Sequence, residues 1–254
     1  MGKNYQIIAF EGLDCSFKET NHRAFVERLQ NWYNGFSNVS IHTESFPRYR
    51  NESSIFLKKW LGNRFDRSMM KDNPKIVDTF YSLDRFCYWY EKEYTAQVWN
   101  DDLHCSFTRI NYLNSNDKFR FFVFDRYNFS NTIYNPIHPG EVHIEDFVFD
   151  RDNFNIPNPD VIVWMRMRDF DTFLNVLAKK EGKDANEMDI EFLRGVWERS
   201  EQLIHSDIYD KIGIKLVVID VLNDDNTIKT KEEIEAKIWE DVFLNGNIGK
   251  INFT

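Results

Sequence analysis

Four short apolar runs, separated by segments with helical spacing, constrain the fold of this chain more than any other feature. The runs lie at residues 5–10, 120–124, 161–165 and 215–220. The candidate helices lie at residues 20–34, 75–98, 169–180, 190–205 and 231–244. Short runs that are apolar throughout are typical of strands buried on both faces, and their alternation with helices indicates a parallel sheet. The sequence therefore predicts an α/β fold with helices on both faces of the sheet, and residues 41–43 are a weaker strand candidate.

Polar residues follow two of these runs directly. EGLD follows the first run, and DRY follows the run at residues 120–124. In open parallel sheets, ligands bind at the carboxyl ends of the strands, so we expect a binding site where these two strands end. We find no internal repeat and no domain boundary, and we predict a single domain over residues 1–254.

The composition fits a globular chain and argues against several classes of protein. Of the 254 residues, 42 % are hydrophobic and 23 are Phe, against only 10 Gly and 6 Pro, which argues against a linker-rich or disordered chain. The formal net charge of −9 argues against a general nucleic-acid binder. No apolar run reaches the length of a membrane span. From the charge and from the length of these runs, we expect neither a nucleic-acid partner nor an association with a membrane.

The three cysteines bear on cellular location. Cys15, Cys87 and Cys105 are odd in number and form no C-x-x-C pair, so neither a disulfide framework nor a zinc site is indicated. A reducing compartment fits this pattern, and the first residues contain no apolar signal region. We expect a cytoplasmic protein, or one of the host cytoplasm if the Phe-, Asn- and Lys-rich composition reflects an AT-rich viral genome.

The stretch EGLDCSFKET at residues 11–20 nearly matches a phosphate-binding loop. A strand, a Gly turn and a helix start place backbone N–H groups around a phosphate, and the usual pattern is G-x-x-x-x-G-K-[ST]. Gly12 and Lys18 hold its outer positions, whereas Phe17 replaces the second glycine and Glu19 replaces the Ser or Thr that meets magnesium. An ordinary strand-turn-helix corner is the alternative interpretation of the same residues.

Four further motifs could carry chemistry. They are FPRY at residues 46–49, SLDRF at residues 82–86, VFDRYNFSNTIYN at residues 123–135 and LAKKEGKDANE at residues 177–187. Taken singly, the first, second and fourth are more typical of a strand exit, a helix with a snorkelling arginine and a charged helical corner. The third places an acid, a base, an amide and a phenol at the end of a buried strand, which favours a polar binding pocket.

Taken together and in this order, the motifs resemble the thymidylate kinase family. The resemblance rests on EGLDxSxKxT, FPRY, LDR, DRYxxSNxxY, PxPDVIVWM and a Lys-rich hairpin, and it spans residues 5 to about 240. It implies a P-loop kinase fold, usually in a homodimer, and transfer of the γ-phosphoryl group of ATP to the 5′-phosphate of thymidylate with Mg²⁺. The DRY block is its most specific part, and the opening loop departs most from the family pattern EGxDGxGKST.

The resemblance implies a donor half of the site around the opening loop. Lys18 would hold the donor phosphates as a catalytic residue, and the catalytic Asp14 would lie between donor and acceptor, near the metal and the sugar. The residues implied in ATP binding are Gly12, Ser16, Lys18, Glu19, Thr20, Lys179, Lys180 and Lys183. The lysines belong to a lid around residues 177–190 that would neutralise charge in the transition state. Asp14 and Asp125 are the implied magnesium ligands.

The resemblance also implies an acceptor half built from the remaining motifs. Phe46 would stack against thymine, and Tyr134 would sit at the sugar edge, where a 2′-hydroxyl would clash. Arg126 would be a catalytic residue beside the acceptor phosphate, and Asn131 would help to read the base. The full set implied in substrate binding is Asp14, Phe46, Arg48, Arg85, Arg126, Asn131 and Tyr134.

Departures from the family pattern leave three hypotheses open. Cys15 is neutral, so the charge must come from lid lysines that lack the fork of arginine, and an insertion is predicted at residues 100–118. The first hypothesis is an active thymidylate kinase with a degenerate P-loop, in which the ring of Phe17 turns into the core. The second, motivated by Phe17 and Glu19, is a non-catalytic relative that binds a nucleotide. The third is a kinase for a different or modified deoxynucleotide.

Overall fold

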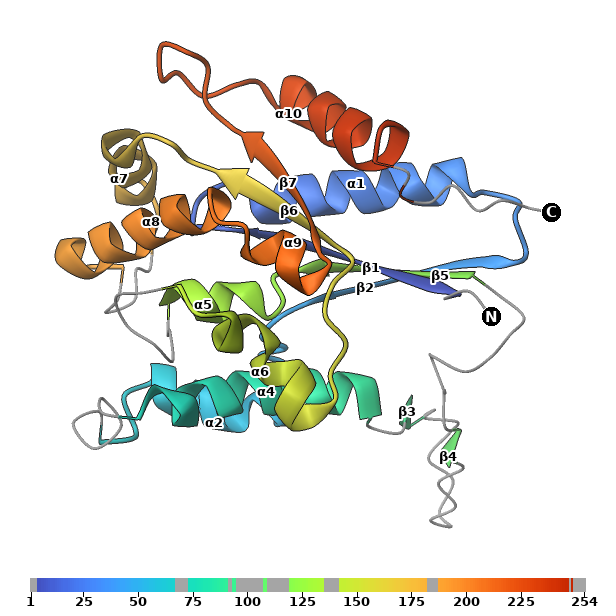
Figure 1. Ribbon diagram of the computed structural model, residues 1–254, viewed down its shortest axis with the longest axis horizontal. Helices are drawn as coiled ribbons and strands as arrows, with labels where there is room; N and C mark the ends of the chain where they lie inside the picture. The colour runs from blue at the N-terminus through green and yellow to red at the C-terminus, as the bar shows by residue number, and fades with distance from the viewer. Residues whose placement is uncertain are drawn as a thin grey trace.

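The computed structural model describes residues 4–66, 73–90, 119–134, 142–181, 187–246 and 248, and the backbone of residues 93–94 and 107–108. Its centre is a parallel five-stranded sheet in the order β2-β5-β1-β6-β7 (Figure 1). The strands are β1 (Tyr5–Gly12), β2 (Val39–Ser45), β5 (Phe119–Asp125), β6 (Val161–Arg166) and β7 (Lys215–Asp220). The prediction of an α/β fold with a parallel sheet is confirmed, and the weaker candidate at residues 41–43 belongs to a full strand.

The three central strands, β1, β5 and β6, are apolar because they are buried on both faces, whereas the edge strands β2 and β7 are only partly buried. Residues 121–124 of β5 are fully buried. Successive side chains of a strand point to opposite faces, so alternate residues of β1 join different clusters. Ile8 and Phe10 belong to the larger buried cluster, whereas Ile7 and Ala9 belong to a second one on the other face. Each large apolar side chain buried in this way stabilises the fold by about 1.5–3 kcal/mol.

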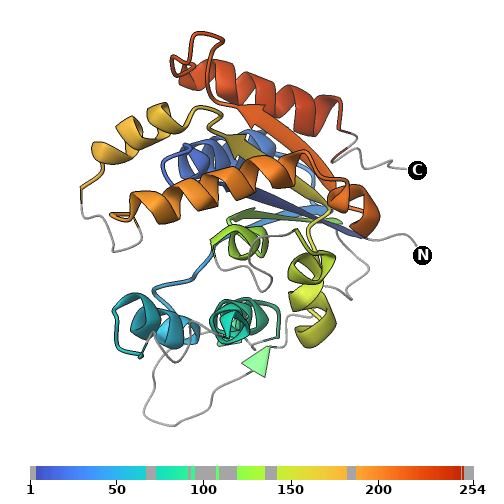
Figure 2. The ribbon, with the colours of Figure 1, turned by 60° about the vertical axis from the view of Figure 1, so that its left-hand side comes forward.

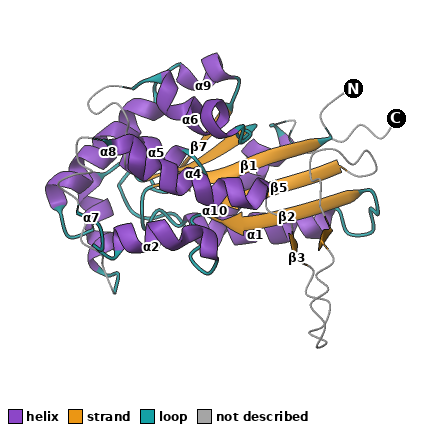
Figure 3. Cartoon of the chain, turned by 90° about the horizontal axis from the view of Figure 1, so that it is seen from below, coloured by secondary structure: helices purple, strands orange, loops and turns teal. Residues whose placement is uncertain are grey.

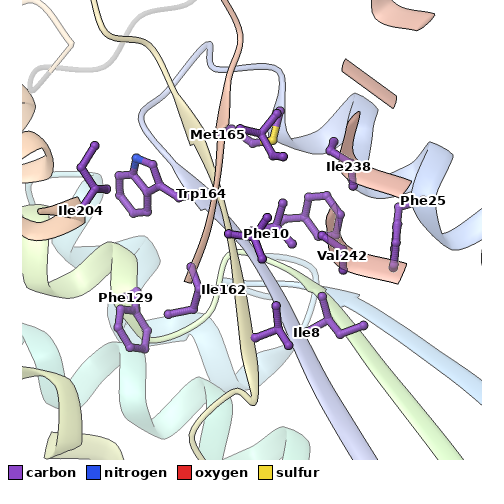
Figure 4. Close-up of a cluster of buried hydrophobic side chains, with 14 of the residues drawn as sticks. Ile8, Phe10, Phe25, Phe129, Ile162, Trp164, Met165, Ile204, Ile238 and Val242 are labelled. Atoms are coloured by element: carbon purple, nitrogen blue, oxygen red, sulfur yellow. The ribbon is translucent and has the colours of Figure 1, made fainter. Parts of the chain in front are cut away.

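Helices cover both faces of the sheet, as Figure 1 shows. One face carries α1 (Lys18–Trp32), α10 (Lys231–Ile238) and the π-helical η2 (Trp239–Leu244), and the other carries α4 (Pro74–Tyr90), α5 (Phe129–Tyr134) and α6 (Ile144–Phe154). Figure 4 shows Phe25 of α1, Ile238 of α10 and Val242 of η2 gathered beside Phe10 of β1. These contacts anchor α1, and with it the loop that precedes α1.

The remaining helices lie in the connections between the strands. The 3-10 turn η1 (Glu52–Ser54) leads into α2 (Ile55–Leu61), and α7 (Phe170–Ala178), α8 (Ile190–Ile204) and α9 (Ile208–Ile212) follow β6. Figure 2 shows α2 and α4 on the opposite side of the molecule from α10. Figure 3 shows the strands running toward the side on which α2, α5 and α7 lie. The carboxyl ends of the strands are therefore surrounded by helices and by the connections that lead into them.

Two predicted segments differ from the observed elements. The helix predicted at residues 75–98 ends at Tyr90, and residues 93–94 form β3 (Glu93–Tyr94), which pairs antiparallel with β4 (Phe107–Thr108). The prediction is wrong at residues 93–94, because aromatic residues such as Tyr94 also favour strands, and the other residues of the segment beyond Tyr90 lie outside the described residues. The predicted insertion at residues 100–118 lies outside the described residues apart from β4. In the described part of the chain, every helix is too short or too polar to cross a membrane.

Candidate functional site

The loop between β1 and α1 curls around one backbone oxygen. The carbonyl oxygen of Leu13 accepts hydrogen bonds from the backbone N–H of Ser16 (3.3 Å), from Ser16 Oγ (2.7 Å) and from Lys18 Nζ. Gly12 opens the loop at a φ of 141°, and a Cβ atom there would lie 2.6 Å from the carbonyl oxygen of Met165. Only glycine fits this position, because β6 approaches so closely and because other residues rarely adopt that φ.

Phe17 adopts a backbone conformation that normally favours glycine. Its φ of 62° and ψ of 20° lie in the left-handed region, which costs other residues roughly 1–2 kcal/mol. Its half-buried ring packs against the main hydrophobic core. The conformation that a glycine would supply is therefore present without the glycine, and the ring has turned toward the core.

Lys18 lies beneath the loop and is nearly buried, with 6 % of its surface exposed. Burial, reinforced by the positive charge of Arg126, lowers the pKa of its ammonium group to about 8, while Asp14 and Asp125 oppose the shift. The group is therefore charged at neutral pH. It is held by a neutral carbonyl, which is a weaker partner for an ammonium group than an ionised phosphate oxygen is.

Asp14, Arg126 and Tyr134 form one hydrogen-bonded group where β1 and β5 end side by side. Arg126 Nη2 binds Asp14 Oδ1, and the Tyr134 hydroxyl donates to Asp14 Oδ2 (3.1 Å) while accepting from the Asp14 N–H (3.0 Å). Burial alone would raise the pKa of the Asp14 carboxyl, but Arg126 and Lys18 lower it to about 2. The structure thus brings together three predicted residues, although 112 and 120 positions separate Asp14 from its partners.

Glu11, which sequence reasoning does not single out, holds the DRY segment against β1. Its buried carboxylate accepts hydrogen bonds from the backbone N–H groups of Tyr127 (2.8 Å) and Phe129 (3.2 Å) and from the hydroxyl of Ser130 (2.5 Å). Burial raises the pKa of this carboxyl, and the hydrogen bond from Ser130 opposes the rise. These bonds fix the turn in which Arg126 has a left-handed φ of 61°. A carboxylate at the end of an apolar strand is the signal that points to Glu11.

The other two predicted arginines are each paired with a buried carboxylate. Arg48 binds Asp84 through its backbone N–H (2.7 Å) and its Nε (3.3 Å). Arg85 binds Asp150 through Nε (2.5 Å) and Nη2 (3.1 Å). The side chains of Arg48 and Arg85 are 8 % and 2 % exposed, against 22 % for Arg126. Arg126 is therefore the most accessible of the three to a ligand.

Of the two predicted magnesium ligands, Asp125 has the less engaged carboxylate, although Asp14 lines the cavity and Asp125 does not. Its Oδ2 accepts a hydrogen bond from Ser45 Oγ (3.2 Å), whereas its buried Oδ1 has no hydrogen-bond partner among the described residues. Both carboxylate oxygens of Asp14 are already engaged by Arg126 and Tyr134. The described residues contain no group of three or more ligating side chains. Mg²⁺ in nucleotide sites needs only one or two carboxylates, because water and phosphate oxygens complete its shell.

A cavity of about 460 Å³ opens where β1, β2 and β5 end. This volume is typical of small-molecule sites. The predicted residues that line the cavity are Asp14, Glu19, Phe46, Arg85, Arg126, Asn131, Tyr134 and Lys180. Residues predicted for the donor and residues predicted for the acceptor therefore share one cavity.

On the acceptor side, one predicted residue lies outside the cavity lining, and one residue of the lining was not predicted. Arg48 does not line the cavity, and its guanidinium group binds Asp84 and Ser53 (3.0 Å). Tyr81 does line it, although sequence reasoning does not single it out. Burial raises the pKa of the Tyr81 phenol, so the group stays neutral and can donate a hydrogen bond. Tyr81 lies one helical turn before Arg85 on α4, and this spacing is the signal that could find it.

On the lid side, Lys180 lines the cavity and Lys179 does not. Lys180 Nζ binds a carboxylate oxygen of Glu187 (2.5 Å), a buried acid that also lines the cavity and that sequence reasoning does not single out. Lys179 is exposed. Lys183 lies outside the described residues, so its predicted role stays a prediction.

At the start of α1, the predicted donor residues differ in exposure. Ser16 is fully buried, and its hydroxyl binds within the loop. Glu19 and Thr20 are both exposed. Glu19 lines the cavity and forms an ion pair with Arg23, one turn along the helix. A neighbouring cation therefore offsets part of the negative charge that Glu19 brings to the loop.

No protein-family model matches this chain, and no curated protein sequence matches it. Solved structures do match. The thymidylate kinase from Candida albicans is 18 % identical, over 97 % of this chain and 95 % of its own, with a TM-score of 0.57. The thymidylate kinase from Ehrlichia chaffeensis is 17 % identical, over 94 % of this chain and 98 % of its own, with a TM-score of 0.54.

This chain has a thymidylate-kinase-like fold. Both similar structures extend over nearly the whole of this chain and of their own, so the likeness covers the complete arrangement of sheet and helices. The predicted P-loop kinase fold is confirmed. At identities of 17 % and 18 %, the likeness shows the fold alone. The chemistry of this chain must be inferred from the residues of the cavity.

Proposed function

We propose that the chain is a nucleoside-monophosphate kinase that transfers the γ-phosphoryl group of ATP to thymidylate. The observation that carries the proposal is the shared cavity, at whose wall Asp14 of the loop binds Arg126 of the DRY segment. A kinase must hold donor and acceptor phosphates next to each other, and candidate anchors for both are adjacent here. The thymidylate-kinase-like fold supports the same function.

On the donor side, the loop binds the ATP phosphates through backbone N–H groups and Lys18. The ammonium group of Lys18 exchanges the Leu13 carbonyl for a phosphate oxygen, which is the stronger, charge-assisted partner. α1 begins at Lys18, so the positive end of its dipole favours the same negative charge. The left-handed Phe17 keeps the backbone in the conformation that the usual glycine provides.

On the acceptor side, Arg126 binds the phosphate group of thymidylate, which competes with Asp14 for the guanidinium. The Tyr134 hydroxyl stays bound to the Asp14 backbone, which keeps the phenol ring at the sugar edge. Phe46 forms an apolar wall for the base. Its ring is held edge-on against Phe124, with the ring centroids 5.3 Å apart. Positioning by rigid groups is what phosphoryl transfer requires of the protein.

In the transfer step, an oxygen of the acceptor phosphate attacks the γ-phosphorus of ATP. The bond from the γ-phosphorus to the bridging oxygen breaks, and ADP leaves with that electron pair. Lys18, Arg126 and Lys180 are the positive groups that act electrostatically on Asp14, and in this proposal their charge stabilises the loose transition state. Asp125 would hold Mg²⁺, which supplies further charge neutralisation when it is bound.

We further propose that the enzyme is a homodimer formed through α4. Ile76, Phe86 and Tyr90 are 36 %, 37 % and 42 % exposed, and the helical period places them on one side of α4. Grouped apolar side chains on a surface mark interaction sites, and a second copy related by a two-fold axis would cover them. Sedimentation over a range of concentrations tests this, and a monomer at every concentration would refute it.

Two other candidate functions each have an observation in their favour. Glu19 favours nucleotide binding without catalysis, because its carboxylate replaces a metal-binding hydroxyl and adds negative charge beside the donor phosphates. The aromatic lining by Tyr49, Trp60 and Tyr81 favours a kinase for a different or modified deoxynucleotide, because it extends the apolar wall beyond Phe46. The Candida albicans structure is itself described as revealing the origin of broad substrate specificity in that enzyme.

ADP formation by the purified protein with ATP, Mg²⁺ and thymidylate, against a blank without thymidylate, tests the proposal. We expect thymidylate-dependent ADP, and we expect Lys18→Met to lower its rate by at least about 100-fold. Lys179→Met is the matched control, because Lys179 is exposed, whereas Lys18 is buried and acts electrostatically on Asp14. If the protein binds thymidylate but forms no ADP, the kinase proposal is refuted and nucleotide binding without catalysis is supported. If ADP appears only with another deoxynucleotide, a kinase for that deoxynucleotide is supported instead.

A further inference from the structure

Arg85 lies in a buried polar cluster between α4 and α6. Its Nε and Nη2 donate to the two carboxylate oxygens of Asp150 at 2.5 and 3.1 Å, and its Nη1 donates to the carbonyl oxygen of Tyr127 at 3.2 Å. The hydroxyl of Ser82, three residues before Arg85 on α4, shares its single proton between Asp150 Oδ1 at 2.5 Å and the carbonyl oxygen of Asp78 at 2.9 Å. Ser82 is fully buried, Arg85 is 1 % exposed and Asp150 is 3 % exposed.

The guanidinium of Arg85 has donors that the protein does not use. A guanidinium carries five N–H bonds, and three are engaged by Asp150 and Tyr127. The other two have no hydrogen-bond partner among the described residues, and Arg85 lines the cavity. Leaving buried N–H donors without hydrogen-bond partners costs free energy, so these two N–H groups suit an oxygen atom of a ligand.

The ion pair between Arg85 and Asp150 is not explained by stability alone. Removing two charges from water costs free energy that their attraction barely returns, so an apolar pair of similar size would hold α4 and α6 together equally well. A carboxylate that engages Nε and Nη2 does, however, fix the plane of the guanidinium. With Nη1 also bound to the Tyr127 carbonyl, one N–H of Nη1 and one N–H of Nη2 are left to face another group.

We propose that Asp150 is a positioning residue for acceptor binding: with Ser82, it orients the guanidinium of Arg85 so that its unused N–H groups meet an oxygen atom of the acceptor nucleotide. That oxygen belongs to the phosphate group or to a carbonyl of the base, since both accept from N–H groups. The inference rests on the proposed function, because it needs a nucleotide in the cavity. Asp150 acts through Arg85 and does not itself touch the ligand.

Calorimetric titration of thymidylate into the purified chain, without ATP, tests this role with Asp150→Asn. Asparagine keeps the size of the side chain but loses its charge and presents an NH₂ group to the guanidinium. We expect thymidylate to bind at least about tenfold more weakly, and ATP affinity to change by less than about twofold. Asp152→Asn is the matched control, because Asp152 lies on the same helix in an exposed ion pair with Arg151.

A milder variant covers the case in which Asp150→Asn does not fold, since Asp150→Asn removes the carboxylate that binds a buried guanidinium. Ser82→Ala keeps both charges and removes one hydrogen bond to Asp150, and we expect about threefold weaker thymidylate binding. A double variant separates orientation from general stability. If Asp150 acts through Arg85, then Asp150→Asn causes no further loss of thymidylate affinity in an Arg85→Gln background.

Titration with thymidine identifies the oxygen that Arg85 meets. Weaker binding of both thymidine and thymidylate by Asp150→Asn would assign it to the nucleoside, and weaker binding of thymidylate alone would assign it to the phosphate. Normal thymidylate affinity in Asp150→Asn and Ser82→Ala would overturn the role of Asp150 and leave the proposed function standing. No thymidylate binding by the unaltered chain would overturn both.

Discussion

The donor and acceptor halves of the cavity offer positive groups to a phosphate by different means. In the donor half, the groups come from the backbone around Leu13 and from Lys18, and Gly12 makes room for the turn. In the acceptor half, they come from side chains, and Arg126 and Arg85 are each oriented by a carboxylate. The sequence departs from the family pattern in the first half and matches it in the second.

A sequence motif therefore has different consequences in a site built from backbone groups and in a site built from side chains. A backbone site tolerates Phe17 because a φ of 62° is reachable at a cost of about 1–2 kcal/mol, and the ring can pack elsewhere. A side-chain site depends on partners that the motif does not contain. Arg48 matches the family pattern, yet Asp84 draws it away from the cavity.

The largest expected effect is the loss of stability in Gly12→Ala, which would break the donor half. The new Cβ would lie 2.6 Å from a backbone oxygen at a φ of 141°, so we expect a cost of about 3 kcal/mol or more in the free energy of unfolding. Gly35→Ala is the control, because Gly35 has a φ of 93° with open space around it and should cost about 1–2 kcal/mol. Urea denaturation measures both. Equal losses would mean that the close approach of Met165 does not constrain the loop.

The next effect concerns the two arginines of the acceptor half that differ most in access. Arg126→Lys should raise the KM for thymidylate by about 100-fold and the KM for ATP by less than about threefold, because lysine lacks the planar fork. Arg48→Lys should change either KM by less than about threefold, because Arg48 does not line the cavity. Steady-state kinetics with each substrate varied gives these values. Similar effects of the two substitutions would contradict the assignment of the acceptor phosphate to Arg126.

A smaller effect follows from the pKa of Lys18, which is about 8 in the folded protein and 10.5 in the unfolded reference. Above pH 8 the ammonium group loses its proton, so ATP affinity should fall about tenfold between pH 7 and pH 9. Because the unfolded state binds more protons between those two pKa values, the contribution of Lys18 to stability rises with pH in that window. Calorimetry at both pH values, with Lys18→Arg as a variant that stays charged, tests the link. A decline of equal size in Lys18→Arg would place its origin elsewhere.

The smallest effect is expected for Phe17→Gly, which tests directly whether the Phe17 side chain obstructs the donor half. The substitution relieves a left-handed conformation worth about 1–2 kcal/mol and loses packing of a half-buried ring of similar worth. The free energy of unfolding should therefore change by less than about 1 kcal/mol, and the rate of ADP formation by less than about threefold. Phe17→Ala loses the ring without the relief and should be less stable by about 1–3 kcal/mol. A rate increase of about 100-fold in Phe17→Gly would identify Phe17 as an obstruction.

The sequence predicts the sheet and the meeting point of its ligand-binding residues for a simple physical reason. Buried parallel strands must be apolar along their length, so β1, β5, β6 and β7 stand out as short runs. Residues that follow neighbouring parallel strands lie close together, and Asp14 and Arg126 do so. The sequence can therefore predict those features of the fold and of the site that depend on the local apolar pattern and on the order of the strands.

The partners of the site residues could not be predicted, because they depend on how separate elements pack. Asp150 lies 65 positions from Arg85 and meets it only through the contact between α4 and α6. Glu11 accepts from backbone N–H groups 116 and 118 positions away, which no side-chain motif records. The left-handed φ of Phe17 could not be predicted either, because this residue type disfavours that backbone conformation.

Titration of ATP and Mg²⁺ into the purified protein by calorimetry tests most directly whether the loop at Gly12 and Lys18 binds donor phosphates. We predict saturable binding with a Kd between about 1 µM and 1 mM, which is lost in Lys18→Met and kept in Lys179→Met. Binding of thymidylate without any binding of ATP at millimolar concentration would contradict this. The cavity would then bind the acceptor nucleotide without a phosphoryl donor. The left-handed conformation of Phe17 would be retained in a loop that no longer binds ATP.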